Sequence, residues 1–252
     1  MQCSTACKLR KCAWARSADS ARRHATWAKS AAQQKAELRR LPRLSVLAGV
    51  NGAGKSSVAG AAVRAVGGEY FNPEEATQEI LVANPGATLH EANIAAWQQG
   101  RRLLERAIVE RLDYAFETPL GGRTMTRLLE RALDVGMEVH VRHVGLEGVS
   151  LHISRVRARV ALGAHDIPEV KIRQRYDQSR RNLVQILPRL SDLTVFDNSI
   201  ESPPVENQHP EPRLLLHTAN GIVLETAPVD SIPTWAKPIL MTALSRAGAR
   251  GR

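Results

Sequence analysis

The pattern of apolar and polar residues divides this chain into short and long segments with different periods. Short runs of branched apolar residues predict buried strands, and longer segments with apolar positions three or four apart predict helices. The strand candidates are residues 44–48, 69–72, 114–116, 137–146 and 193–196. The helix candidates are residues 57–66, 73–82, 88–112, 124–133, 149–162, 169–187 and 234–245. Strands that alternate with helices predict an α/β fold with a mainly parallel sheet.

Local signals refine the ends of these elements and divide the chain into parts. Thr88 and Glu91 have the spacing of a helix capping box, and Asn220-Gly221 between two apolar runs predicts a β-hairpin. A polar, Pro-rich segment precedes that hairpin. We expect three parts: a flexible basic extension over 1–43, a core over 44–200, and a hairpin and helix over 201–252 that pack on the core and end in a frayed tail.

The stretch LSVLAGVNGAGKSSV, residues 44–58, contains a phosphate-binding loop. A buried strand leads into a segment that satisfies the pattern G-x-x-x-x-G-K-[ST] at every fixed position. Gly52 and Gly54 let backbone amides turn toward a phosphate, Lys55 supplies a charge for the β- and γ-phosphates, and the Ser56 hydroxyl is placed to bind Mg²⁺. The nucleotide-binding residues that we expect are Gly49, Asn51, Gly52, Ala53, Gly54, Lys55, Ser56 and Ser57. The loop therefore predicts a protein that binds a nucleoside triphosphate.

Composition adds a distinction between the extension and the rest of the chain. The 252 residues carry a formal net charge of +10, but eleven Lys and Arg against two acidic residues lie within residues 1–43. The remainder is nearly neutral, so the basic charge does not favour a nucleic-acid partner for the core. Cys3, Cys7 and Cys12 also lie in the extension, and they are interpreted as free thiols in a reducing cytoplasm. No apolar run is long enough to span a membrane.

Phosphoryl transfer needs a carboxylate, cationic side chains and a cover that excludes water, and the chain offers candidates for each. Glu74 and Glu75 follow the second predicted strand, and Glu117 ends the third. Four arginines lie in two successive predicted helices that could close over a triphosphate: Arg155, Arg159, Arg173 and Arg175. Spacing leaves alternatives open, because carboxylates also stabilise the first turn of a helix and arginines also line solvated helix faces.

Six stretches resemble, in order, motifs of the zeta-toxin family of phosphate-loop kinases. They are residues 48–57, 70–76, 116–122, 163–168, 172–183 and 195–199. They match the patterns G-x-N-G-A-G-K-S, F-x-N-x-D-x-I-A, E-T-T-L-S-G, G-G-H-x-I-P, I-x-R-R-Y-x-x-S-x-x-N-L and D-N-S. The resemblance covers roughly residues 44–200, and it implies a three-layer phosphate-loop kinase fold with helices on both sides of a mainly parallel sheet.

The resemblance also implies an activity and a set of site residues. A protein of this kind transfers the γ-phosphate of ATP or GTP, with Mg²⁺, to a hydroxyl of a small molecule. In well-known members the acceptor is the nucleotide sugar UDP-N-acetylglucosamine, and an antitoxin protein binds the kinase. By position, Lys55 and Ser56 bind the phosphates and Mg²⁺, and Arg155 or Arg159 contacts the triphosphate, with a second such arginine expected near His165. The residues implied in acceptor binding are Asn72, Glu117, Thr118, Arg173 and Arg175.

Several positions depart from the family pattern. Glu74 stands where the family has the Asp that acts as general base, and Glu carries its carboxylate one methylene further out. Gly121 stands where Ser is frequent, and Gln174 and Ala164 replace the usual Arg and Gly. We therefore keep two alternatives to a nucleotide-sugar kinase: a kinase for another small hydroxyl compound, as in the chloramphenicol phosphotransferases that share the fold, and a catalytically weakened ATP-binding module. A nucleic-acid kinase recruited by the basic extension is the least favoured alternative.

Overall fold

The computed structural model describes residues 40–60, 69–163, 166–200 and 211–250. Its strands are β1 (Arg43–Ala48), β2 (Glu69–Phe71), β3 (Tyr114–Thr118), β4 (Glu138–Gly145), β5 (Asp192–Asp197), β6 (Arg213–Ala219) and β7 (Ile222–Thr226). Its longer helices are α3 (Pro73–Ala83), α4 (Leu89–Glu110), α5 (Arg123–Asp134), α6 (Val149–Ala161), α7 (Glu169–Ile186) and α8 (Lys237–Arg250). Shorter helical turns are η1 (Ser56–Gly60), η2 (Leu187–Arg189) and η3 (Val229–Ser231).

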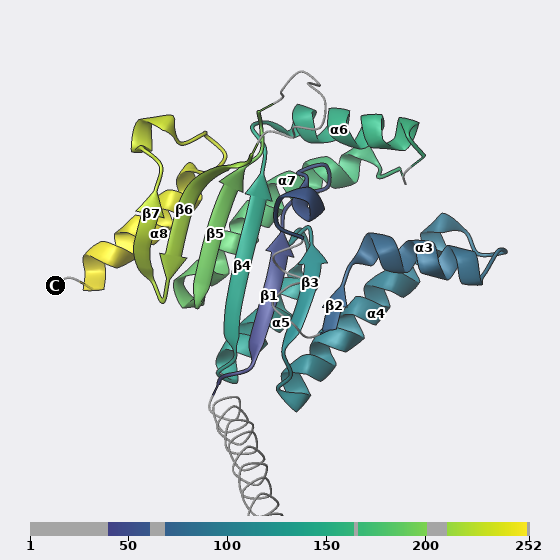
Figure 1. The fold of residues 1–252 in the computed structure, drawn as a ribbon, viewed down its shortest axis with the longest axis horizontal. Helices are drawn as coiled ribbons and strands as arrows, with labels where there is room; N and C mark the ends of the chain where they lie inside the picture. Colours follow the sequence, from purple (N-terminus) through teal and green to yellow (C-terminus); the bar gives the residue numbers. More distant parts are fainter. Residues whose placement is uncertain (1–39, 61–68, 164–165, 201–210, 251–252) are drawn as a thin grey trace, which may run out of the picture. The chain divides into compact units, whose positions relative to one another are not determined.

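The strands form one sheet in the order β2-β3-β1-β4-β5-β6-β7 (Figure 1). The five strands β2, β3, β1, β4 and β5 are parallel, and β6 and β7 add an antiparallel hairpin at one side. The register aligns the carboxyl ends of the parallel strands, since Ala48 pairs with Thr118 and Gly145 pairs with Asp197. Ligands of open parallel sheets bind at this edge, so the topology brings together the residues that follow β1, β2, β3 and β5.

The central strand β1 is buried on both faces. Leu44 and Val46 contact a core cluster that includes residues of α5, α7 and α8, whereas Leu47 packs with Ala53 and Val144 in a second cluster. Figure 1 shows α5, α7 and α8 on one side of the sheet and η1 on the other. A strand covered on both faces needs apolar side chains at successive positions, which explains the unbroken apolar run seen in the sequence.

Two of the turn signals are confirmed in detail. The Thr88 hydroxyl accepts a hydrogen bond from the backbone N–H of Glu91, and the Glu91 carboxylate accepts from the backbone N–H of Thr88, so the capping box is complete. In the β6–β7 hairpin, Asn220 and Gly221 have φ of 50° and 75°. Positive φ at both central residues is the requirement of the two-residue turn that Asn-Gly favours.

Two predicted helix boundaries are wrong, and a third is only partly tested. The helix expected over 57–66 begins as a π-helical turn over Ser56–Gly60, and the rest of that prediction lies outside the described residues. Helix α4 ends at Glu110 rather than 112, because Arg111 adopts a left-handed conformation (φ 55°) that terminates the helix. Helix α8 begins at Lys237 rather than 234, and its backbone stays helical to Arg250, where a frayed tail was expected.

Some predictions lie outside the described residues. They concern the flexible basic extension with its three cysteines, and most of the Pro-rich segment before the hairpin. In the part of the chain that the structure describes, no helix has the length and hydrophobicity required to cross a bilayer.

We expect Gly145→Ala to destabilise the fold. A Cβ at Gly145, the last residue of β4, would lie 2.4 Å from the buried Trp235 ring. Overpacking of this kind lowers the free energy of unfolding by about 1–3 kcal/mol, which chemical denaturation would measure. Gly86→Ala is the matched control, because a Cβ there meets nothing within 4 Å; equal stabilities for the two variants would contradict this packing.

Candidate active site

The phosphate loop has a backbone conformation that favours glycine at three positions, namely the two glycines that the pattern G-x-x-x-x-G-K-[ST] fixes and Gly52 between them. Gly49, Gly52 and Gly54 have φ of +144°, +83° and +80°. A Cβ on Gly52 would lie 2.6 Å from the backbone oxygen of His152, and one on Gly54 would lie 2.5 Å from the Asn198 amide nitrogen. The backbone angles therefore favour glycine at both positions, and at Gly52 the neighbouring backbone also leaves no room for a side chain.

Neighbouring elements fix this loop through its polar groups. The backbone oxygen of Asn51 accepts a hydrogen bond from His152 Nδ1 on α6 (2.9 Å), and the Asn51 side-chain oxygen accepts one from Arg175 Nη1 on α7 (2.8 Å). Asn198, which follows β5, donates from Nδ2 to the backbone oxygen of Ala53 (2.9 Å). The loop is thus held by three elements besides its own strand, which favours a single preformed shape.

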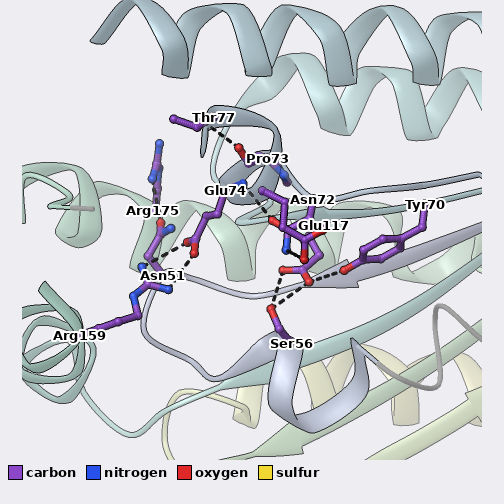
Figure 2. Close-up of polar contacts among 11 residues, drawn as sticks. Asn51, Ser56, Tyr70, Asn72, Pro73, Glu74, Thr77, Glu117, Arg159 and Arg175 are labelled. Carbon is purple, nitrogen blue, oxygen red and sulfur yellow. Dashed lines mark hydrogen bonds and ion pairs between the residues drawn. The ribbon is translucent and has the colours of Figure 1, made fainter. Parts of the chain in front are cut away.

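The residue predicted to bind Mg²⁺ lies against a buried carboxylate. Ser56 Oγ donates a hydrogen bond to Glu117, at 3.0 Å from Oε1, and the Tyr70 hydroxyl donates to the same oxygen (Figure 2). Glu117 is the fourth residue of β3 and is only 6% exposed. Because β2, β3 and β1 are adjacent, the oxygen atoms of Tyr70, Glu117 and Ser56 lie next to one another near the carboxyl edge of the sheet.

Charged groups converge on Lys55. Burial lowers the pKa of the Lys55 amine, while Glu117 and Glu74 raise it and Arg159 and Arg175 lower it further. The same burial lowers the pKa of the Arg175 guanidinium. These groups comprise three cations and two carboxylates in a partly desolvated space, and such an excess of positive charge suits an anionic ligand.

A bidentate ion pair joins α3 to α6 beside the loop. Arg159 Nη1 donates to Glu74 Oε2 at 2.8 Å, and Nη2 donates to Oε1 at 3.2 Å (Figure 2). Arg155 lies one turn earlier on α6, and its charge contributes to lowering the pKa of His152. The prediction that α6 would bring arginine toward the phosphate loop is thus consistent with the position of Arg159.

Three residues predicted to bind the acceptor have structural contacts. The Asn72 side chain caps α3 by accepting from the backbone N–H of Glu74 (2.9 Å), and Thr118 Oγ1 accepts from the backbone N–H of Leu120 (3.0 Å). Arg173 binds Glu169 one turn earlier on α7, through Nη2 at 2.6 Å, and its side chain is 53% exposed. Arg175 contacts the loop and Arg173 does not, because residues 173 and 175 project from different sides of a helix.

The contacts around Ser57 and Gly121 show why each of these residues fits its position. Ser57 Oγ donates to the backbone oxygen of Gly54 (3.0 Å) and so supports the turn that ends the loop. A Cβ at Gly121 would lie 2.6 Å from Cγ of Arg175, so the departure from the usual Ser leaves room for the Arg175 stem to reach Asn51. Gln174, another departure, is exposed. The motif around His165, including Ala164, falls partly outside the described residues.

Sequence reasoning missed three residues that shape the site. Tyr70 was placed in a strand and motif without a role, and Asn198 was part of the D-N-S motif without one. His152 gave no signal, because a lone histidine on an apolar helix face does not predict a contact with a loop 101 residues away. The position of Asn198 directly after a strand could have indicated its role.

Comparison with solved structures places this fold among known ones. One chain of the AvrRxo1-ORF1:AvrRxo1-ORF2 complex with sulphate ions has a TM-score of 0.58 and 13% identity, over 82% of this chain and 65% of its own length. The AvrRxo1-ORF1:-ORF2 structure with ATP gives 0.58 and 14% over the same shares, and the native complex gives 0.56 and 14% over 82% and 76%. The chain therefore shares its fold with that chain of the AvrRxo1-ORF1:AvrRxo1-ORF2 complex. The predicted fold class is confirmed, and the chain spans about two thirds of the length of the first two neighbours.

Sequence comparison gives a shorter match. A protein of Haemophilus influenzae is 28% identical over 128 residues, which are 51% of this chain and 88% of the relative, and its name states no function. No protein-family profile matches the sequence. The fold is therefore known from structure, while the reaction has to be inferred from the residues at the site.

Two buried histidines should make stability depend on pH. Burial lowers the pKa of His143 to about 3 and of His152 to about 4, from an ordinary 6.5. The unfolded chain then binds more protons than the folded one between pH 6.5 and these lowered values, so the free energy of unfolding falls as the pH falls through that range. Each histidine contributes a slope of up to about 1.4 kcal/mol per pH unit.

Denaturant unfolding of the wild type and of His143→Gln, measured at several values of pH, would test this dependence. The variant should have a shallower slope below neutral pH, because one of the two buried imidazoles is gone. An identical slope in both proteins would contradict the burial of His143 as a neutral ring.

Proposed function

We propose that this protein is a Mg²⁺-dependent kinase that transfers the γ-phosphate of ATP or GTP to a hydroxyl group of a small molecule. One observation carries the proposal: several groups lie together with the phosphate loop at the carboxyl edge of the sheet. They are Lys55, the Ser56–Glu117 contact and the Arg159 guanidinium. A phosphate loop alone supports nucleotide binding. The added carboxylates and arginine are the parts that phosphoryl transfer requires.

The residues present fit a magnesium ion. Mg²⁺ binds oxygen ligands, and in kinases it uses one or two carboxylates together with phosphates and water. Ser56 and Glu117 supply a hydroxyl and a buried carboxylate whose oxygens lie 3.0 Å apart. We infer that these two residues would hold the ion, which supplies positive charge to the phosphate oxygens during transfer.

The chain's own residues have separable roles in the transfer. Gly52 and Gly54 shape the loop around the phosphates, and Lys55 and Arg159 offset the charge that spreads over the γ-phosphoryl oxygens. The bond between the γ-phosphorus and the β–γ bridging oxygen breaks, the acceptor oxygen bonds to that phosphorus, and the nucleoside diphosphate leaves. The acceptor hydroxyl loses its proton to a base, and the resemblance indicates Glu74 for this step.

The acceptor that we propose is a nucleotide sugar such as UDP-N-acetylglucosamine, on the resemblance of the motifs. Residues near the loop that could contact it are Asn72, Thr118 and Arg175, while Arg173 would need to leave Glu169 to do so. A partner protein that acts as antitoxin is also proposed. Its support is the resemblance, together with a structural neighbour that was solved as a two-protein complex and with ATP.

A phosphoryl-transfer assay would test the proposed function. Purified protein would be incubated with Mg²⁺ and γ-labelled ATP or GTP, in parallel, with a panel of UDP-sugars, nucleosides and other small alcohols. We expect label on UDP-N-acetylglucosamine, and none with Lys55→Ala, because that variant lacks the phosphate-binding cation. Label on a different alcohol would keep the kinase and change the acceptor. Nucleotide binding without transfer to any acceptor would contradict the proposed activity and favour a nucleotide-binding module.

Glu117→Gln should raise the requirement for magnesium. The amide is close in size to the carboxylate and can still accept from Ser56 and Tyr70, but it lacks the negative charge that attracts the ion. We expect the Mg²⁺ concentration for half-maximal transfer to rise by on the order of tenfold. A magnesium titration of the reaction rate measures it, and an unchanged midpoint would show that Glu117 does not help to hold the ion.

A further inference from the structure

The contacts of Glu74 point to a role different from that of a general base. Both of its carboxylate oxygens already accept charge-assisted hydrogen bonds from Arg159, at 2.8 and 3.2 Å. This is the planar, two-bond geometry that fixes a guanidinium in orientation as well as in position. The two side chains come from α3 and α6, so the pair also ties together helices that the chain separates by 85 residues.

Arg159 retains donors for a ligand, because its two bonds to Glu74 use only two of the five N–H groups of the guanidinium. Its Nε is buried and has no hydrogen-bond partner among the described residues, whereas both of its terminal nitrogens bind Glu74. A buried N–H without an acceptor is costly and rare in folded proteins. Arg159 also lies close enough to Lys55 to lower the pKa of its amine. A phosphate oxygen bound at the loop would supply the acceptor that this buried N–H lacks.

The length of the Glu74 side chain matters for this contact. Its backbone is fixed, because Asn72 caps α3 through the Glu74 backbone N–H at 2.9 Å, and Pro73 precedes it at the first turn. An aspartate at this position would withdraw the carboxylate by about 1.5 Å, the length of one carbon–carbon bond. Such a carboxylate would lose the two-bond geometry unless the Arg159 side chain or a helix shifted. The Glu in this chain, at the position where the family has Asp, is therefore long enough to make the contact with Arg159.

We propose that Glu74 is a positioning residue, which orients Arg159 toward the phosphates of the bound nucleotide, and not the base that accepts the hydroxyl proton. This inference rests on the proposed function only in taking the ligand to be a nucleoside triphosphate. It assigns the Glu74–Arg159 pair to the nucleotide side of the site. Positioning through a clamped arginine suits a reaction in which the enzyme acts mainly by orientation and charge stabilisation.

Glu74→Asp separates the two roles, because it keeps the charge and restores the family's residue. Loss of the clamp would weaken the preference for ATP over ADP, whereas loss of a base would lower the transfer rate and leave the binding of both nucleotides unchanged. The dissociation constants of ATP and ADP with Mg²⁺ would be measured by calorimetry for the wild type, Glu74→Asp, Glu74→Gln, Arg159→Ala, and the combination of Glu74→Gln with Arg159→Ala. We expect the preference for ATP over ADP to fall roughly tenfold in each single variant, and the combination to be no weaker than Arg159→Ala alone.

Catalytic constants add a second readout, on whichever acceptor is found. Glu74→Gln should retain the acidic limb of the pH–rate profile, since the titrating base is another group. The proposal would be overturned if Glu74→Asp kept the wild-type rate and ATP preference while Glu74→Gln lowered kcat by ~10²- to 10⁴-fold, as removal of a general base does. A rise in ATP affinity in Glu74→Gln would also overturn it, because Glu74 would then merely repel the phosphates.

A charge-preserving control uses an ion pair remote from the loop. Asp134 on α5 binds Arg189 at 2.6 Å, and their side chains are 63% and 45% exposed. Asp134→Glu changes the reach of that carboxylate in a solvated pair and should alter the ATP and ADP constants by less than about twofold. The measurements of ATP and ADP binding decide the role of Glu74 even if no acceptor is phosphorylated. A lack of phosphorylation would contradict only the proposed activity. A wild type that binds neither nucleotide would overturn both.

Discussion

The rest of the site depends on the backbone conformation of the phosphate loop, which glycine adopts readily and other residues rarely adopt. Gly52 and Gly54 have positive φ, and each is closely approached by a neighbouring element, the backbone of α6 at His152 and the amide of Asn198 after β5. Space and backbone angle therefore impose the same requirement. Because the loop is pinned by elements on both sides of β1, its amides are oriented before any phosphate binds, and the binding of an anion need not order them.

The electrostatics around the loop follow from the burial of Lys55 and from the charged groups near it. Lys55 lies in a partly desolvated space where its positive form is disfavoured, and Glu117 and Glu74 compensate in part. Arg159 and Arg175 are held by their own partners, Glu74 and the Asn51 amide oxygen. A triphosphate would restore the stabilisation that Lys55 and Arg175 lose by burial, so ligand binding and the local electrostatics are coupled.

The carboxylates of the site differ in environment although all look alike in the sequence. Glu117 is buried and accepts hydrogen bonds from hydroxyl groups on two other elements, which suits contact with a metal ion and its ligands. Glu74 is half exposed and binds a guanidinium. Glu75 receives the Asn72 side-chain amide at the start of α3. The three glutamates differ in their contacts because of the strand order and the side of the helix on which each lies, and not because of the identity of the residue.

The sequence by itself determined the alternation of strands and helices, the phosphate loop and the capping signals, because each depends on neighbours within a few residues. The sequence also predicts Lys55, Ser56, Glu117 and Arg159 as site residues. Only the tertiary structure decided that Tyr70 and Ser56 share Glu117, that His152 fixes the loop, and that Arg175 reaches the loop while Arg173 binds Glu169. These contacts join residues far apart in the chain, and they are set by strand order and by the side of each helix that faces the sheet.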